Sequence, residues 1–142
     1  TKYIIDFIHN NFRNKKGIGI VGYCMSGRFV VCCGAYYAKE ILAIASFYGV
    51  DILTQKNDSP HLLADKIKGD LYLAFAETDM WVPEKVIKKI KIAFSNLKKC
   101  NIEIFSGTDH GFAFPERNTY IKEAAEKHWE KLMNLFEKNL KQ

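Results

Sequence analysis

The chain has 142 residues, of which 48% are hydrophobic and 26% are charged, and its formal net charge at pH 7 is +5. This composition is ordinary for a globular protein and excludes the fibrous and disordered classes, and the length suffices for one domain with a sizeable core. The lysines are spread along expected helix faces, and we find no nucleic-acid-binding motif. We therefore expect no nucleic-acid partner.

The sequence also bears on membranes, metals and disulfides. No run approaches the ~18 apolar residues of a membrane span, and the first residues, TKYIIDFIHNNF, lack the pattern of a signal peptide. The four cysteines, at positions 24, 32, 33 and 100, have no C-x-x-C spacing. We therefore expect reduced thiols, no metal site, no membrane partner and a cytoplasmic location.

Apolar runs and amphipathic patterns alternate along the chain. The expected elements, in chain order, are a helix over 3–13 that ends at Lys15-Lys16-Gly17, a strand over 18–23, a helix over 25–38, a strand over 41–48, a weaker helix near 60–68, a strand over 71–76, a helix over 86–97 that follows Pro83, a strand over 102–105, and a long helix over 121–135. Continuous apolar strands between helices predict a mostly parallel sheet with helices on both faces. We therefore expect residues 1–142 to form a single α/β domain.

Three reactive side chains follow three of the expected strands. Cys24 follows the first strand, Asp79 the third and His110 the fourth. Because ligands bind beyond the carboxyl ends of parallel strands, these side chains are expected to share one edge of the sheet. The order nucleophile, acid, histidine is that of the α/β-hydrolase triad. Glu77 and Asp109 are alternative acids, and Asp109 is too close to His110 in sequence to reach its far ring nitrogen easily.

The stretch GYCMSG, residues 22–27, has the features of a turn that presents a nucleophile. A strained strand-to-helix turn requires small neighbours, here Gly22 and Ser26. The start of a helix favours a thiolate at Cys24, and an imidazole can take the thiol proton. The N–H of Met25 is then placed to donate a hydrogen bond to an oxyanion.

The remaining cysteines and histidines have simpler interpretations. Cys32 and Cys33 lie inside the expected second helix and are interpreted as core residues. His128 lies on the apolar face of the last helix, where a packing histidine with satisfied hydrogen bonds is expected. His9 and His61 follow no expected strand.

The blocks GYCMSGR, ETDMWVP and GTDHGFAFPERNTY resemble the three conserved blocks of the dienelactone hydrolase family, within the α/β-hydrolase superfamily. The resemblance covers the whole chain. It implies a catalytic triad of Cys24, Asp79 and His110, with Cys24 as the nucleophile. It also implies hydrolysis of a small ester or lactone through an acyl-enzyme, without a cofactor. The founding activity of the family is hydrolysis of dienelactone, and many relatives act on other esters or lactones.

The chain departs from the family pattern near the expected substrate site. Ser26 stands where family members usually have glycine. Phe114 stands where the dienelactone-specific enzymes have an arginine, and Arg117 lies three residues further on. The resemblance implies that Tyr48 and Trp81, together with Phe114, line the substrate site, although ordinary aromatic packing explains Tyr48 and Trp81 equally well.

Family domains also contain several strands before the first helix seen here. By this comparison, residues 1–142 are the C-terminal part of the domain, from the strand before Cys24 onward. One edge of residues 18–21 is then without a partner, and we expect a second chain or a missing N-terminal segment to cover it. The alternatives are a catalytically incomplete homologue that acts as a binding or scaffold module, and a redox-sensing thiol at Cys24.

Overall fold

The computed structural model describes residues 1–12 and 17–141, and its strands form one parallel sheet. The sheet order is β1-β2-β3-β4, with β1 at Ile18–Tyr23, β2 at Ile41–Phe47, β3 at Asp70–Thr78 and β4 at Cys100–Asp109. The helices are α1 (Lys2–Asn11), α2 (Ser26–Tyr36), the 3-10 helix η1 (Pro60–Lys66), α3 (Glu84–Ala93) and α4 (Lys122–Leu140). The predicted parallel α/β architecture is confirmed.

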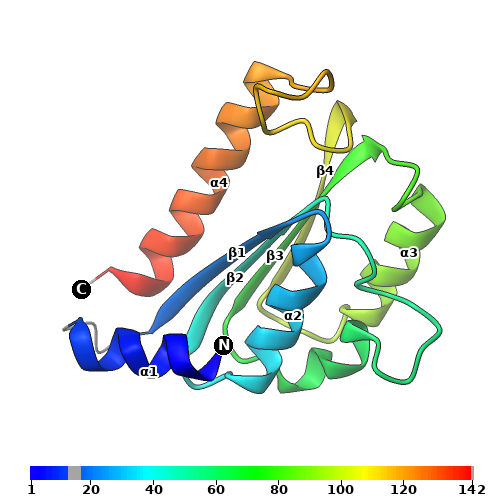
Figure 1. Ribbon diagram of the computed structural model, residues 1–142. Coiled ribbons are helices and arrows are strands. Elements are labelled where there is room, and N and C mark those ends of the chain that lie inside the picture. The colour runs from blue at the N-terminus through cyan, green and yellow to red at the C-terminus, as the bar shows by residue number, and fades with distance from the viewer. Residues whose placement is uncertain (13–16, 142) are drawn as a thin grey trace.

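The sheet has helices on both faces. In Figure 1, α2 and α3 lie on one side of the strands, and the long α4 crosses the other side. Each face therefore has its own apolar core. One core joins the sheet to α2 and α3 through residues such as Val31, Leu73 and Ile90, and the other is rich in aromatic residues and includes Phe47 and Leu132.

Several predicted boundaries differ from the observed ones: α4 continues to Leu140 instead of ending at 135, and β3 and β4 are longer than predicted. The apolar runs predict strands over 71–76 and 102–105, but the sheet extends each strand into polar residues at its carboxyl end. The register pairs Thr78 with Asp109, so backbone hydrogen bonding continues after the side chains become exposed. The weak helix near 60–68 is a 3-10 helix, and the helix expected over 86–97 begins at 84, directly after Pro83, and ends at 93. The first helix, predicted over 3–13, ends at Asn11 with Phe12 already extended, so its end was predicted two residues too late; Lys15 and Lys16 lie outside the described residues.

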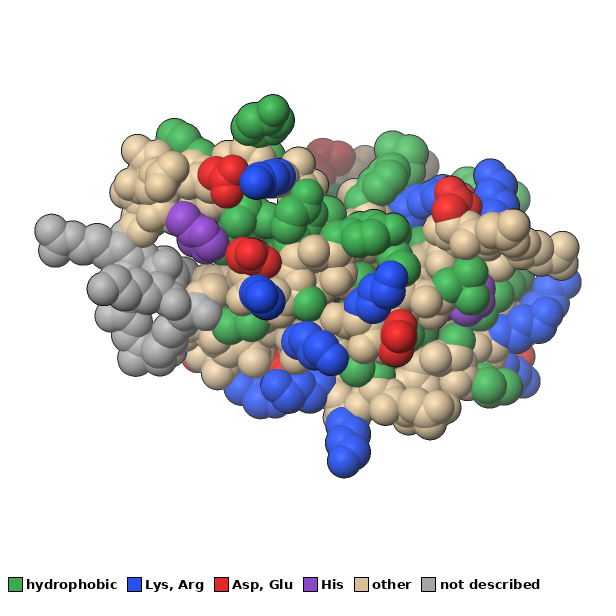
Figure 2. Space-filling model, turned by 90° about the horizontal axis from the view of Figure 1, so that it is seen from below, with side chains coloured by type: hydrophobic (Ala, Val, Ile, Leu, Met, Phe, Trp, Pro, Cys, Tyr) green, Lys and Arg blue, Asp and Glu red, His purple; other side chains and the backbone are tan. Residues whose placement is uncertain are grey.

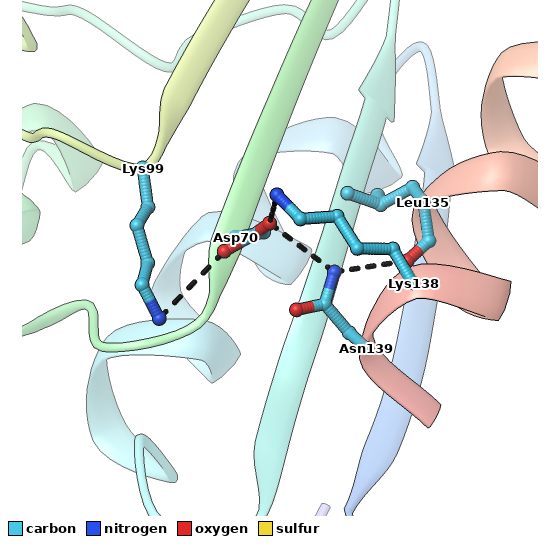
Figure 3. A network of polar contacts seen from close by, with 5 residues as sticks. All are labelled: Asp70, Lys99, Leu135, Lys138 and Asn139. Carbon is cyan, nitrogen blue, oxygen red and sulfur yellow. Dashed lines mark hydrogen bonds and ion pairs between the residues drawn. The ribbon is translucent and has the colours of Figure 1, made fainter. Parts of the chain in front are cut away.

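The C-terminal part of α4 is anchored to the start of β3 through Asp70 (Figure 3). Lys138 donates a hydrogen bond of 2.6 Å to Asp70 Oδ2, Asn139 donates one of 3.3 Å to the same oxygen, and Lys99 Nζ lies 3.8 Å from Oδ1. Burial alone would raise the pKa of Asp70, but the hydrogen bonds from Lys138 and Asn139 and the nearby lysine charges lower it below its ordinary value. The ionised carboxylate therefore helps to hold α4 on the sheet.

The surface seen from below in Figure 2 has no single basic area. Its Lys and Arg side chains lie apart, with acidic and apolar side chains between them. The expectation that nucleic acid is not a partner stays untested.

Within the described part of the chain, no helix combines the length and the apolar character that crossing a bilayer requires.

Candidate active site

Cys24 occupies a sharp turn between β1 and α2. Its φ angle is +51°, in the left-handed region that non-glycine residues rarely adopt. The turn is held by the backbone on both sides of the thiol: Cys24 N–H donates to the Phe47 carbonyl at 3.1 Å, and the Cys24 carbonyl accepts from Gly27 at 3.0 Å and Val50 at 3.1 Å. Such strain persists only where surrounding contacts determine the conformation, and it is typical of functional sites.

The residues around this turn approach each other closely. A Cβ atom at Gly22 would lie 2.6 Å from the carbonyl oxygen of Ser26, closer than real Cβ contacts permit, so the turn needs glycine there. Ser26 has a role that its size alone does not predict. Its hydroxyl accepts from Tyr23 N–H at 2.8 Å and donates to the Tyr23 carbonyl at 2.7 Å, so both backbone groups of the residue before Cys24 are bound.

Asp79 and His110 form a hydrogen-bonded pair at the carboxyl ends of β3 and β4. The Asp79 Oδ2 atom lies 2.6 Å from His110 Nδ1. The other oxygen, Oδ1, accepts from the backbone N–H groups of Trp81 at 2.9 Å and Val82 at 3.1 Å, which fixes the carboxylate. Because a carboxylate only accepts, Nδ1 carries the proton in this bond.

The second ring nitrogen of His110, Nε2, differs from Nδ1 in its surroundings. His110 Nε2 is buried and has no hydrogen-bond partner among the described residues. With the ring proton held on Nδ1 by Asp79, Nε2 of the neutral imidazole presents a lone pair. The site therefore contains a base that is oriented by a carboxylate and free to accept a proton.

The two alternative acids lie elsewhere. Glu77 Oε2 accepts a 2.7 Å hydrogen bond from Gly107 N–H, which joins the ends of β3 and β4. Asp109, the last residue of β4, is exposed. Of the three candidate acids, only Asp79 has a hydrogen bond to His110, and Asp79 is also the acid that the sequence favours.

Aromatic rings connect the turn at Cys24 with His110. The Tyr48 ring lies 4.9 Å from the His110 ring and 5.8 Å from that of Tyr23, the residue before Cys24. Cys24 packs against the same cluster that contains Tyr48. Trp81 lies 4.7 Å from His110, and Phe114 lies 5.0 Å from Tyr23, all between ring centroids. Of the three aromatic residues predicted for the substrate site, Tyr48 and Trp81 thus lie beside His110, and Phe114 lies beside Tyr23.

Tyr48 combines burial with an unsatisfied hydroxyl. It is 2% exposed, has a φ of +39°, and its hydroxyl has no hydrogen-bond partner among the described residues. Burial raises the pKa of Tyr48 above its ordinary value. The negative charges that Tyr23 and Cys24 can carry add to this effect, while the Arg117 guanidinium opposes it. The phenol is therefore a neutral donor beside the imidazole.

An open pocket of about 580 Å³ adjoins His110 on the side of the loop that follows β4. Trp81, His110 and Arg117 contribute to its lining, together with Thr78, Met80, Asp109, Glu116, Asn118 and Thr119. Cys24 is not among these lining residues. The imidazole thus adjoins a cavity whose lining includes an arginine but not Cys24.

Met25 follows Cys24 and is the N-cap of α2. Its side chain is exposed, and its backbone lies at the positive end of the helix dipole. The predicted role of its N–H toward an oxyanion is consistent with this position and stays a prediction.

The other cysteines are half-buried, and of the other histidines His9 is exposed while His61 and His128 are hydrogen-bonded within the protein. Burial raises the pKa of Cys100 to about 12, and burial is also the largest cause of the raised pKa of Cys32. His61 Nδ1 is hydrogen-bonded to Ser59 Oγ at 2.7 Å. His128 is wholly buried and hydrogen-bonded at both ring nitrogens, so the packing interpretation is confirmed. Among residues 1–12 and 17–141, no group of three His, Cys, Asp or Glu side chains is placed to hold a metal ion.

The parallel sheet, the strained turn after β1 and the acid–histidine pair define an α/β-hydrolase fold. The family model described as "Dienelactone hydrolase family" matches residues 4–140, and the chain belongs to the dienelactone hydrolase family. A "Putative carboxymethylenebutenolidase" of Synechocystis sp. (strain ATCC 27184 / PCC 6803 / Kazusa) is 35% identical over 129 residues, covering 87% of this chain and 51% of that protein. A protein of the same name from Aquifex aeolicus (strain VF5) is 31% identical over 128 residues, covering 89% of this chain and 53% of that protein. The chain thus spans about half the length of these relatives.

Solved structures agree on the fold. A "Putative Dienelactone Hydrolase" from Klebsiella pneumoniae superposes with a TM-score of 0.85 at 18% identity, covering 95% of this chain and 57% of that chain. A dienelactone hydrolase-like promiscuous phosphotriesterase from metagenomic libraries superposes with a TM-score of 0.79, also at 18% identity, covering 97% of this chain and 59% of that chain.

Proposed function

We propose that this chain carries the nucleophile, base and acid of a cysteine hydrolase that cleaves small esters or lactones. The observation that carries the proposal is the 2.6 Å bond between Asp79 and His110, which leaves Nε2 buried and without a hydrogen-bond partner in the part of the chain that the structure describes. The strained turn at Cys24 supports it, as does membership of a family whose relatives bear a carboxymethylenebutenolidase name. No cofactor is needed for this chemistry.

In the proposed reaction, His110 Nε2 takes the proton of the Cys24 thiol. The sulfur attacks the ester carbonyl, an S–C bond forms, and the carbonyl electron pair moves to oxygen as an oxyanion. When the carbonyl re-forms, the bond to the leaving oxygen breaks, and that oxygen receives the proton from His110. A water molecule then attacks the thioester with His110 as base, the carboxylic acid leaves, and the thiol is restored. Asp79 stabilises the imidazolium in both halves of the cycle.

Backbone and aromatic groups complete the proposed site. Met25 N–H, at the start of α2, donates to the oxyanion. The buried hydroxyl of Tyr48 donates to a polar atom of the substrate, because it has no partner among the described residues. Trp81 and Phe114 provide apolar walls for the acyl or ring portion.

The proposal is tested by hydrolysis of p-nitrophenyl acetate and a panel of lactones. Cys24→Ala removes the nucleophile and is expected to abolish turnover, while Cys100→Ala is the matched control at a thiol whose pKa is raised to about 12 by burial. Full activity of Cys24→Ala would refute the assignment. An inert chain whose Cys24 reacts with iodoacetamide no faster than an ordinary thiol would favour a binding or scaffold module instead.

We also propose that a strand from outside these 142 residues pairs with the free edge of β1. In the described sheet, β1 pairs with β2 on one side only. The bond from Cys24 to Phe47 puts the backbone groups of Cys24 on the β2 side, so by alternation those of Gly19, Val21 and Tyr23 face the other edge. Val21 is 37% exposed there, and an apolar unpaired edge favours association with another strand.

Ser26 determines which residues of β1 are available to pair with an added strand. Its hydroxyl already binds both backbone groups of Tyr23, so an added strand has Gly19 and Val21 as its partners. Amide hydrogen exchange tests this: slow exchange at Gly19 and Val21 in the intact protein is the expected result. Rapid exchange at both amides in an active, monomeric protein would refute the pairing.

A further inference from the structure

The side chain of Tyr23, the residue directly before Cys24, is bound by the helix on the far side of the aromatic core. Its hydroxyl lies 2.6 Å from Nε2 of His128, a residue of α4 that is wholly buried. The two residues are 105 positions apart in the sequence. The bond therefore connects α4 with the strand end that carries the nucleophile.

The donor and acceptor in this bond follow from the second ring nitrogen. His128 Nδ1 lies 2.8 Å from the carbonyl oxygen of Ala125, which can only accept, so Nδ1 carries a proton. Burial lowers the pKa of His128 and raises that of Tyr23 to about 12, so both side chains are neutral near pH 7. Nε2 is then a bare acceptor, and the Tyr23 hydroxyl donates to it.

The rest of Tyr23 is held equally firmly. Its ring stacks on Phe47 at 5.4 Å between centroids with an interplanar angle of 19°, and it meets Phe114 edge-on at 5.0 Å. Its backbone N–H and carbonyl are both bound by Ser26 Oγ. Hydroxyl, ring and backbone are each fixed by a different element, and the next residue in the chain is the strained Cys24.

We propose that the Tyr23–His128 hydrogen bond positions the nucleophile. Cys24 keeps its φ of +51° only while its neighbours determine it, and the tyrosine next to it contacts α2, β2 and α4. Fixing the Tyr23 side chain against α4 fixes the direction in which Cys24 leaves β1, and hence the position from which its sulfur would reach His110 in the proposed reaction. The inference rests on the proposed function, because it concerns the reactivity of Cys24. Tyr23 and His128 are positioning residues and touch no substrate.

The test compares two variants, each of which replaces a tyrosine by phenylalanine and so removes only the hydroxyl. Tyr23→Phe removes the hydroxyl that binds His128. Tyr72→Phe is the matched control, because the Tyr72 hydroxyl likewise donates a hydrogen bond, of 2.7 Å to Glu103, but from β3 and away from the turn; Tyr72 is buried, whereas Tyr23 is half-buried. For each protein, the rate of alkylation of Cys24 by iodoacetamide is measured by peptide mass mapping, together with kcat and KM for p-nitrophenyl acetate and the urea midpoint of unfolding.

We expect Tyr23→Phe to slow alkylation of Cys24 and to lower kcat by about 10-fold, within the ~100-fold that a misplacement of about 1 Å can cost, with KM nearly unchanged. Tyr72→Phe is expected to lower the urea midpoint similarly and to leave both rates as in the wild type. Equal alkylation and kcat in the wild type, Tyr23→Phe and Tyr72→Phe would overturn the inference.

Two variants of His128 supply a second comparison, which decides the matter if Tyr23→Phe does not fold. His128→Gln offers an amide oxygen near the position of Nε2, whereas His128→Leu offers no acceptor. Faster alkylation of Cys24 in the glutamine variant supports the inference, and equal rates in both overturn it. A wild-type Cys24 that reacts like an ordinary thiol would refute the proposed function itself, and with it the premise of the inference.

Discussion

Replacing Asp79 by asparagine would test how the site controls the imidazole. Asp79 Oδ1 accepts from the N–H groups of Trp81 and Val82, and the asparagine oxygen can keep these bonds. The asparagine NH2 group then faces His110 Nδ1, where the carboxylate now lies at 2.6 Å. Because both groups cannot donate in one bond, the ring proton moves to Nε2, the atom that must accept the thiol proton.

The size of the effect follows from the bond that is lost. A hydrogen bond to a charged group contributes about 1.5–3 kcal/mol, which corresponds to a loss of about 10- to 100-fold in kcat. The change to the wrong tautomer extends the loss toward the ~10⁴-fold known for the equivalent change in a serine protease. The carboxylate also stabilises the imidazolium in both halves of the proposed cycle, so acylation and deacylation should both slow.

The assay is steady-state hydrolysis of p-nitrophenyl acetate, with the rate of Cys24 alkylation measured from pH 5 to 9. Glu77→Gln is the matched control, because Glu77 makes its hydrogen bond to Gly107 rather than to His110. We expect Asp79→Asn to lower kcat and Glu77→Gln to leave it near the wild-type value. Unchanged turnover in Asp79→Asn, in a protein that depends on Cys24, would show that the carboxylate does not orient the base.

Further predictions concern the turn, the acid stability and the other thiols. Gly22→Ala places a Cβ 2.6 Å from the Ser26 carbonyl oxygen, so we expect a loss of about 1–3 kcal/mol, measured from urea unfolding, and no loss would contradict the close approach. The lowered pKa of Asp70 contributes stability that is complete above the ordinary carboxyl pKa of about 3.9 and is lost as the pH falls through the lowered value. Asp70→Asn removes this contribution, so the urea midpoint of the variant should fall less steeply on acidification than that of the wild type. An equally steep fall in both proteins would argue against this anchor. Burial raises the pKa of Cys100 to about 12, so mass mapping should find it alkylated well after Cys24, and the reverse order would contradict the assignment of the reactive thiol.

The sheet and the edge at which the site lies were predictable because both follow from local patterns. Each buried strand is a continuous apolar run, and parallel strands place their carboxyl ends together, so Cys24, Asp79 and His110 were expected at one edge. The hydrogen bond between Asp79 and His110 then agrees with the preferred choice among three acids. Strand ends were predicted less well, since β3 and β4 continue by backbone pairing after their side chains become polar.

The contacts that hold the turn were not predictable from the sequence. Ser26 was expected only to be small, yet its hydroxyl binds both backbone groups of Tyr23, which depends on the path of the turn. No sequence pattern distinguishes Tyr23, and the position of His128 on the apolar face of the last helix indicates only packing. Their hydrogen bond joins two distant elements across a sheet face, and no local pattern in the sequence indicates it.

The central claim is that Cys24 forms the covalent intermediate, and rapid acid quenching during p-nitrophenyl acetate turnover tests it most directly. Peptide mass mapping of the quenched protein should find an acetyl thioester on Cys24, with no such adduct and no turnover in Cys24→Ala. Turnover that persists in Cys24→Ala, with no acetyl group on Cys24 in the quenched wild type, would contradict the account.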